Sequence, residues 1–186
     1  MSLKNTSTRY GLVSVMLHWI IALTVIGQFS VGWYMVQLNY YSPLYQVLPA
    51  VHKSIGILFA CALVFRIIWS ACSTKPAPAE GISRWNHIAA KSAQHLMNIL
   101  LLIIVLLGYL ISTAEGDPID VFGWFEVPAT ITSIKNQEDV AGFWHYWVAV
   151  GLMTLAGIHA LAALKHHYFD KDATLVRMLG RDHRSH

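Results

Sequence analysis

The stretch FWHYWVAVGLMTLAGIHALAALKHHYF, residues Phe143 to Phe169, places two histidines inside a long apolar run. His145 and His159 are fourteen residues apart, which is nearly four complete turns of an α-helix. Both imidazoles would therefore leave the same face of one helix, about 21 Å apart along its axis. What this face does depends on what the rest of the chain places against it.

The composition is that of a membrane protein. The 186 residues are 55% hydrophobic and only 12% charged, and the mean hydropathy is +0.48. These values exclude an ordinary soluble domain of this length. Seven Trp and eight Tyr suit a chain with two membrane interfaces to line. The net charge of +3 is modest and no basic run occurs, so nothing indicates nucleic-acid binding.

Four apolar runs are long enough to cross a bilayer, at about residues 12–34, 51–69, 93–112 and 143–164. The first run is expected to be a retained helix, because it is too long for a signal peptide and no A-x-A-like site follows it. We therefore predict one all-α domain over residues 1–186, an integral-membrane four-helix bundle.

Lys and Arg are distributed unevenly among the connections, which predicts the orientation. Only Lys53 and Lys135 lie on one side, together with the acidic residues Glu115, Asp117, Asp120, Glu126, Glu138 and Asp139. The other side holds Lys4, Arg9, Arg66, Lys75, Arg84, Lys91, Lys165, Lys171, Arg177, Arg181 and Arg184. By the positive-inside rule both termini of this multi-pass protein are cytoplasmic.

Depth in the membrane sorts the histidines into two pairs. His18 and His159 lie toward the cytoplasm, whereas His52 and His145 lie toward the periplasm. Paired neutral imidazoles without carboxylate or thiolate are the axial ligands that a six-coordinate b-type haem needs. No CxxCH motif is present for covalent attachment. We predict two b-type haems, bound non-covalently.

Small residues support this prediction, and His95 leaves an alternative open. A Gly or Ala follows each proposed ligand by one turn, where it could make room for a porphyrin: Ala22, Gly56, Ala149 and Ala163. His95 could replace His18 as the partner of His159. We favour instead a hydrogen bond from His95 to Asn98, to Gln94 or to a haem propionate. A haem-free protein that uses its histidines as a proton relay is a further alternative.

Four segments resemble the ligand regions of the bacterial cytochrome b561 family, which are four-helix di-haem membrane cytochromes. These segments are RYGLVSVMLHW (9–19), VHKSIG (51–56), WHYW (144–147) and GIHALAALKHHYF (157–169). The resemblance implies one haem on His18 and His159, another on His52 and His145, and electron transfer linked to ubiquinone. It also implies that the chain is a multi-pass protein of the bacterial inner membrane. Some members resemble superoxide:ubiquinone oxidoreductases, and others are similar to cytochrome subunits that anchor a redox partner.

Two further residues are candidates for binding cofactors, while no catalytic residue is assigned. Arg66 could pair with a propionate of the cytoplasmic haem, and His166 could hydrogen-bond or protonate quinone. Besides membrane lipid and quinone, we expect either superoxide or a periplasmic redox protein as partner. The acidic periplasmic side suits a cationic protein better than the superoxide anion.

Overall fold

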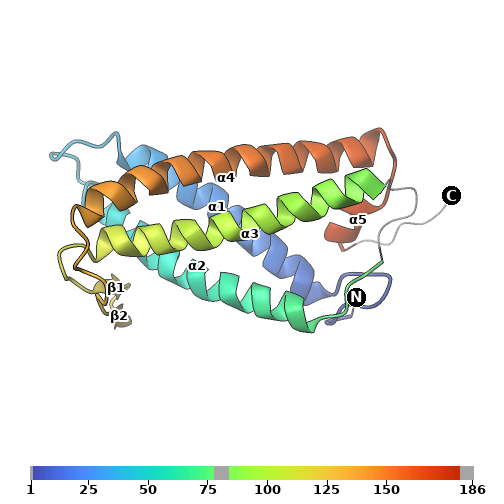
Figure 1. Cartoon of the computed structure of the whole chain (residues 1–186), viewed down its shortest axis with the longest axis horizontal. Coiled ribbons are helices and arrows are strands. Elements are labelled where there is room, and N and C mark those ends of the chain that lie inside the picture. Colours follow the sequence, from blue (N-terminus) through green and yellow to red (C-terminus); the bar gives the residue numbers. More distant parts are fainter. Residues whose placement is uncertain (1, 78–83, 181–186) are drawn as a thin grey trace.

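The computed structural model describes residues 2–77 and 84–180. Four long helices form a bundle (Figure 1): α1 Leu12–Met35, α2 Val47–Cys72, α3 Arg84–Ser112 and α4 Gln137–Tyr168. Each contains a stretch long and apolar enough to cross a membrane. The predicted all-α membrane bundle is therefore confirmed. A short helix, α5 Thr174–Met178, follows α4.

The helices extend beyond the apolar runs that the sequence marks as membrane spans. Helix α3 begins at Arg84 and α4 begins at Gln137, in both cases before the hydrophobic run starts. The length of an apolar run matches the thickness of the bilayer, whereas the helix itself continues through polar residues until a residue that ends helices is reached. Pro49 lies in the first turn of α2, where the missing backbone N–H has no helical partner to lose.

A small β-hairpin interrupts the connection between α3 and α4, which the sequence analysis did not foresee. Strands β1 (Ile119–Val121) and β2 (Phe125–Val127) pair in antiparallel register. Ile119 and Val121 are buried, and β1 packs against α2. Ser54 ties the two elements together, because its Oγ donates to the Asp120 carbonyl at 3.2 Å.

The rest of this connection is fixed to the end of α3. The Tyr109 hydroxyl donates to the Pro128 carbonyl at 2.9 Å and accepts from the Thr130 N–H at 2.8 Å. Gln137, the first residue of α4, is buried, and its Nε2 donates to the carbonyls of Leu110 and Ile131. These bonds fix the start of α4 just over two turns before His145.

At the opposite end of the bundle the N-terminal segment folds back onto α1. A Cβ at Gly11 would overlap the backbone of Leu3 and Lys4, so this position requires glycine. The Asn5 side chain accepts from the Gly11 N–H at 2.8 Å and donates to the Thr74 carbonyl at 3.0 Å. The segment thus joins the start of α1 to the end of α2.

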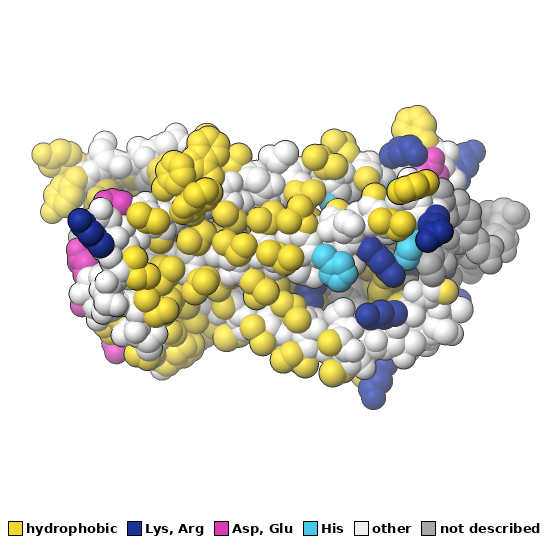
Figure 2. All heavy atoms as spheres, in the orientation of Figure 1, with side chains coloured by type: hydrophobic (Ala, Val, Ile, Leu, Met, Phe, Trp, Pro, Cys, Tyr) yellow, Lys and Arg dark blue, Asp and Glu magenta, His cyan; other side chains and the backbone are white. Residues whose placement is uncertain are grey.

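The packed core is a single layer in the middle of the bundle. It consists of Ile21, Phe59, Leu63, Leu101 and Leu152, one or two from each helix. Many other apolar side chains are exposed, as expected for a lipid-facing surface. Figure 2 shows such side chains over the middle of the molecule.

Charged side chains gather at the two ends of the molecule (Figure 2). On the face drawn, Lys and Arg concentrate at the end where α4 finishes, and Asp and Glu lie mostly at the other end. Figure 1 places the N-terminal segment from residue 2 and helix α5 at this Lys- and Arg-rich end. Of the basic residues used to predict orientation, Arg181 and Arg184 lie outside the described residues.

Candidate haem sites

The first candidate site is formed by His52 of α2 and His145 of α4. Their ring centres are 6.2 Å apart, and the ring planes are inclined at 72°. A metal–imidazole bond of about 2 Å and a ring radius of about 1 Å would put two rings that bind one metal from opposite sides about 6 Å apart. The observed separation therefore fits a pair of axial ligands.

A backbone hydrogen bond fixes the tautomer of His145. Nδ1 lies 3.1 Å from the carbonyl oxygen of Ile104 in α3. Because a carbonyl can only accept, Nδ1 carries the proton and donates it. The other ring nitrogen, Nε2, then keeps its lone pair for a metal. The hydrogen bond also holds the ring plane and raises the basicity of the ligand.

His52 has a buried nitrogen that nothing satisfies. Its Nδ1 is shielded from solvent and has no hydrogen-bond partner within residues 2–77 and 84–180. Leaving a buried polar group unpaired costs about 1–3 kcal/mol, so such an atom is expected where a further group binds. His52 therefore fits a site built around an added group.

Glycines on the neighbouring helices leave space beside both rings. A Cβ at Gly108 of α3 would lie 3.3 Å from Cε1 of His145, and a Cβ at Gly32 of α1 would lie 3.5 Å from Cε1 of His52. Any larger side chain would press on the imidazoles or fill the space next to them. The sequence analysis missed both glycines, although each lies at the depth of this histidine pair.

Gly56 borders a polar contact between α1 and α2, and its role beside a porphyrin stays a prediction. The space left by its missing side chain faces Gln28 of α1, whose Nε2 would lie 3.6 Å from a Cβ at this position. The same Nε2 donates to the carbonyl of His52 at 2.9 Å. Gly56 thus makes room for a polar contact between α1 and α2, because Gln28 crosses to the backbone of the next helix there.

The second candidate site brings together His18, Arg66 and His159. His18 lies within electrostatic range of both other residues. His18 is half-buried and His159 is exposed. Arg66 has no carboxylate partner in the described part of the chain, and its Nη1 donates to Asn98 Oδ1 at 3.2 Å. A guanidinium within a membrane span needs an anion, so Arg66 fits the predicted contact with a propionate.

Among the described residues His95 forms neither protein hydrogen bond that was preferred for it, to Asn98 or to Gln94, and its contact with a haem propionate stays a prediction. Asn98 faces Arg66 instead, and His95 is exposed, with no hydrogen bond among the residues that the structure describes. The alternative role of His95 as a ligand remains a prediction to be tested.

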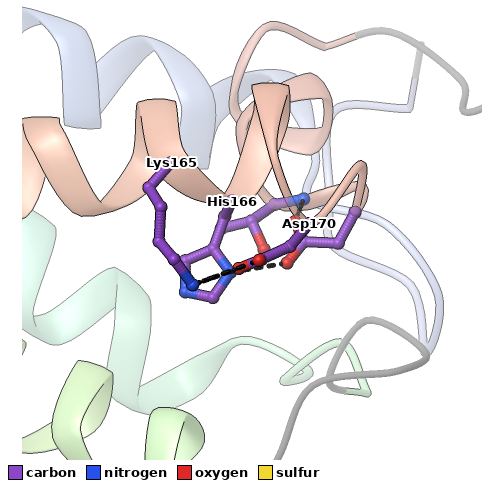
Figure 3. A network of polar contacts seen from close by, with 5 residues as sticks. Lys165, His166 and Asp170 are labelled. Carbon is purple, nitrogen blue, oxygen red and sulfur yellow. Dashed lines mark hydrogen bonds and ion pairs between the residues drawn. The ribbon is translucent and has the colours of Figure 1, made fainter.

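His166 lies in a polar cluster just beyond these sites, at the end of α4. Its Nδ1 is 2.9 Å from Asp170 Oδ2 and 2.9 Å from Asp172 Oδ2. Lys165 also pairs with Asp170, at 2.8 Å (Figure 3). The two aspartates were not predicted, although their spacing after His166 in a short turn could have indicated them.

The donor set of both pairs suits haem better than a structural metal ion. Within the described ranges no group of three or more His, Cys, Asp or Glu side chains could hold a metal. Zinc sites normally use four protein ligands, or three and a water, whereas a haem iron needs only two axial ligands. Leu152 lies midway between His145 and His159 on α4, so the apolar core layer separates the two pairs.

Comparison with known proteins defines the class. The sequence model of the prokaryotic cytochrome b561 family matches residues 9–181. The chain therefore belongs to the prokaryotic cytochrome b561 family, as the sequence motifs predicted. Membership implies that the protein is a bacterial membrane protein that binds b-type haem.

Three relatives match over nearly their whole length. Cytochrome b561 homolog 2 of Escherichia coli K12 is 46% identical, over 97% of this chain and 96% of the relative. Cytochrome b561 homolog 1 of the same strain is 26% identical, over 93% of this chain and 98% of its own. A protein named probable superoxide oxidase CybB from Yersinia pestis is 27% identical, over 92% of this chain and 96% of the relative.

Proposed function

We propose that this protein is a di-haem cytochrome that transfers electrons across the membrane between a one-electron donor and ubiquinone. One b-type haem would be held by His52 and His145, and the other by His18 and His159. The observation that carries this proposal is the His52–His145 pair, with its 6.2 Å ring separation and the hydrogen bond from His145 to Ile104.

The chain's own residues have binding and orienting roles in this function. When bound, haem supplies one-electron oxidation and reduction of iron. Ile104 orients His145, Gly32 and Gly108 leave room beside the rings, and the apolar layer around Leu152 excludes water between the sites. Arg66 would neutralise a propionate. His166, at the proposed cytoplasmic end, would interact with quinone.

The orientation proposed for the chain places both termini in the cytoplasm. Support comes from the basic residues at the end that holds the N-terminal segment and α5, and from the acidic residues around the β-hairpin. A reporter enzyme that is active only in the periplasm should work when fused after Asn136, and should fail when fused after Lys75 or at His186. Activity of the His186 fusion would reverse the orientation and the assignment of each histidine pair to a side.

Superoxide is the first candidate donor, supported by the name of the Yersinia relative, probable superoxide oxidase. A redox protein of the periplasm is the second candidate, and the charge distribution favours it. Residues 115–127 contain four carboxylates and no Lys or Arg. A negative surface repels a small anion and attracts a cationic protein. In the second case the chain would be a cytochrome subunit without a substrate of its own.

Mixing the purified protein with a superoxide source and a short-chain ubiquinone tests the choice. If superoxide is the donor, haem reduction should be rapid and should slow by about 10-fold or more in Lys53→Glu, because this exposed lysine adjoins His52. Lys135→Glu on the same side, away from the ligands, is the matched control. No reduction by superoxide, with ready reduction by a periplasmic redox protein, would establish the second candidate.

A further inference from the structure

The chain reverses direction just after α4 and brings two carboxylates to one imidazole. Lys171 has a left-handed backbone conformation, with φ of 53°, between Asp170 and Asp172. Both aspartates consequently reach back to His166, whose Nδ1 is 2.9 Å from an oxygen of each. Figure 3 shows the His166 ring next to Asp170, with Lys165 on the same carboxylate.

The three side chains differ in exposure in a way that suits proton transfer. The side chain of Asp172 is only 8% exposed, that of His166 is 19% exposed and that of Asp170 is 34% exposed. A nearly buried carboxylate requires a positive partner. Lys165 contacts Asp170, so the His166 imidazole is the group beside Asp172 that can carry a positive charge. Arg177 of α5 donates instead to the carbonyl of Ala77.

Asp172 is held so that one oxygen is directed at the imidazole. Its Oδ1 accepts the backbone N–H of Thr174 at 2.8 Å, which leaves Oδ2 for His166. His166 Nδ1 forms no hydrogen bond with the described residues, so its two contacts with the carboxylates are ion pairs only when the imidazole is protonated. The hydrogen bond from Lys165 lowers the pKa of the Asp170 carboxyl, which keeps this group ionised.

The cluster is not needed to close the end of α4. The backbone N–H groups of Phe169 and Asp170 already bond to the Lys165 carbonyl, and Lys165 itself lies in the last turn. His166 also follows His159 by seven residues, which is about two turns or about 10 Å along the axis. It therefore lies on the same face of α4 as His145 and His159.

We infer that His166, Asp170 and Asp172 form the proton-uptake site for the quinone reaction, with Asp172 as the positioning residue for His166. This inference rests on the proposed function. Asp172 and Asp170 hold Nδ1, which leaves Nε2–H free to face a quinone oxygen. For each electron that quinone receives, the Nε2–H bond breaks and an O–H bond forms. Nε2 then regains a proton from water, and two such cycles give quinol.

Stopped-flow measurement on the intact protein in nanodiscs tests this inference. The protein is reduced with dithionite and mixed with a short-chain ubiquinone, and the rate of haem reoxidation is followed. His166→Gln and Asp172→Asn should each lower the maximal rate by about 100-fold, the usual contribution of a general acid, without changing the half-saturating quinone concentration. Asp172→Glu should restore most of the rate. Added imidazole should partly restore it in His166→Ala.

His167→Gln is the matched control, since this neighbouring histidine contacts the ring of Tyr168 and lies outside the cluster. Rates of His166→Gln and Asp172→Asn equal to that of His167→Gln would overturn the inference. A raised half-saturating concentration with an unchanged maximal rate would also overturn it, because the cluster would then only bind quinone. If the unmodified protein binds haem but is not reoxidised by quinone, the proposed function itself fails.

Discussion

Replacing His145 with Ala should reduce the haem content from two to one per chain, and His52→Ala should remove the same haem. A haem bound by two axial ligands from different helices loses both its second ligand and the link between those helices. We expect haem loss to be more complete in the His145 variant than in the His52 variant, because the His145 ring is also held by the Ile104 carbonyl. Reduced-minus-oxidised spectra and a haem assay on the purified variants measure the loss.

The remaining histidines provide the controls for this result. The double variant should lose no more haem than either single variant, since both residues serve one site. His18→Ala and His159→Ala should remove the other haem, which the spectra can distinguish. His95→Ala should keep both haems. If His95→Ala loses a haem and His18→Ala does not, the cytoplasmic pair has been assigned wrongly.

Gly108→Leu should remove the haem of the His52–His145 site while sparing the other haem. The first carbon of the new side chain would already lie 3.3 Å from His145 Cε1, and the remaining carbons would occupy the space beside the ring. Strain from an overfilled site is about 1–3 kcal/mol, which the chain can relieve by excluding the bound group. Haem content per monodisperse protein, read from the spectra, is the measurement.

Gly142→Leu is the matched control for this substitution. Gly142 lies in α4, one turn before His145, and a Cβ there would meet nothing within 4 Å. Its haem content should be unchanged. Retention of both haems in Gly108→Leu, with unaltered spectra, would show that this glycine does not border a haem.

Most of the fold could be predicted from the sequence because a membrane restricts the possibilities. The four apolar runs had to be helices, since only a helix satisfies its own backbone hydrogen bonds in lipid. The hairpin at Ile119–Val127 could not be predicted in the same way. Its strands are three residues long, and they depend on Ser54 and α2 for their position.

The candidate site was predictable in its side chains but not in its backbone. Depth alone paired His52 with His145, and the structure brings these two rings together. The hydrogen bond from His145 to the Ile104 carbonyl could not be predicted from the sequence, because every residue has a backbone carbonyl. Gly32 and Gly108 were not predicted because small residues were sought only on each ligand's own helix, whereas these two glycines lie on neighbouring helices. Helix packing decides which small residue faces a ring.

The number of haems per chain tests the central claim most directly. A pyridine haemochrome assay on the purified, intact protein gives this number when it is combined with the protein concentration. The paired histidines at two depths predict two non-covalent b-type haems per chain. A value of one would leave one of the two histidine pairs without its proposed role. A value of zero would contradict the account of both sites.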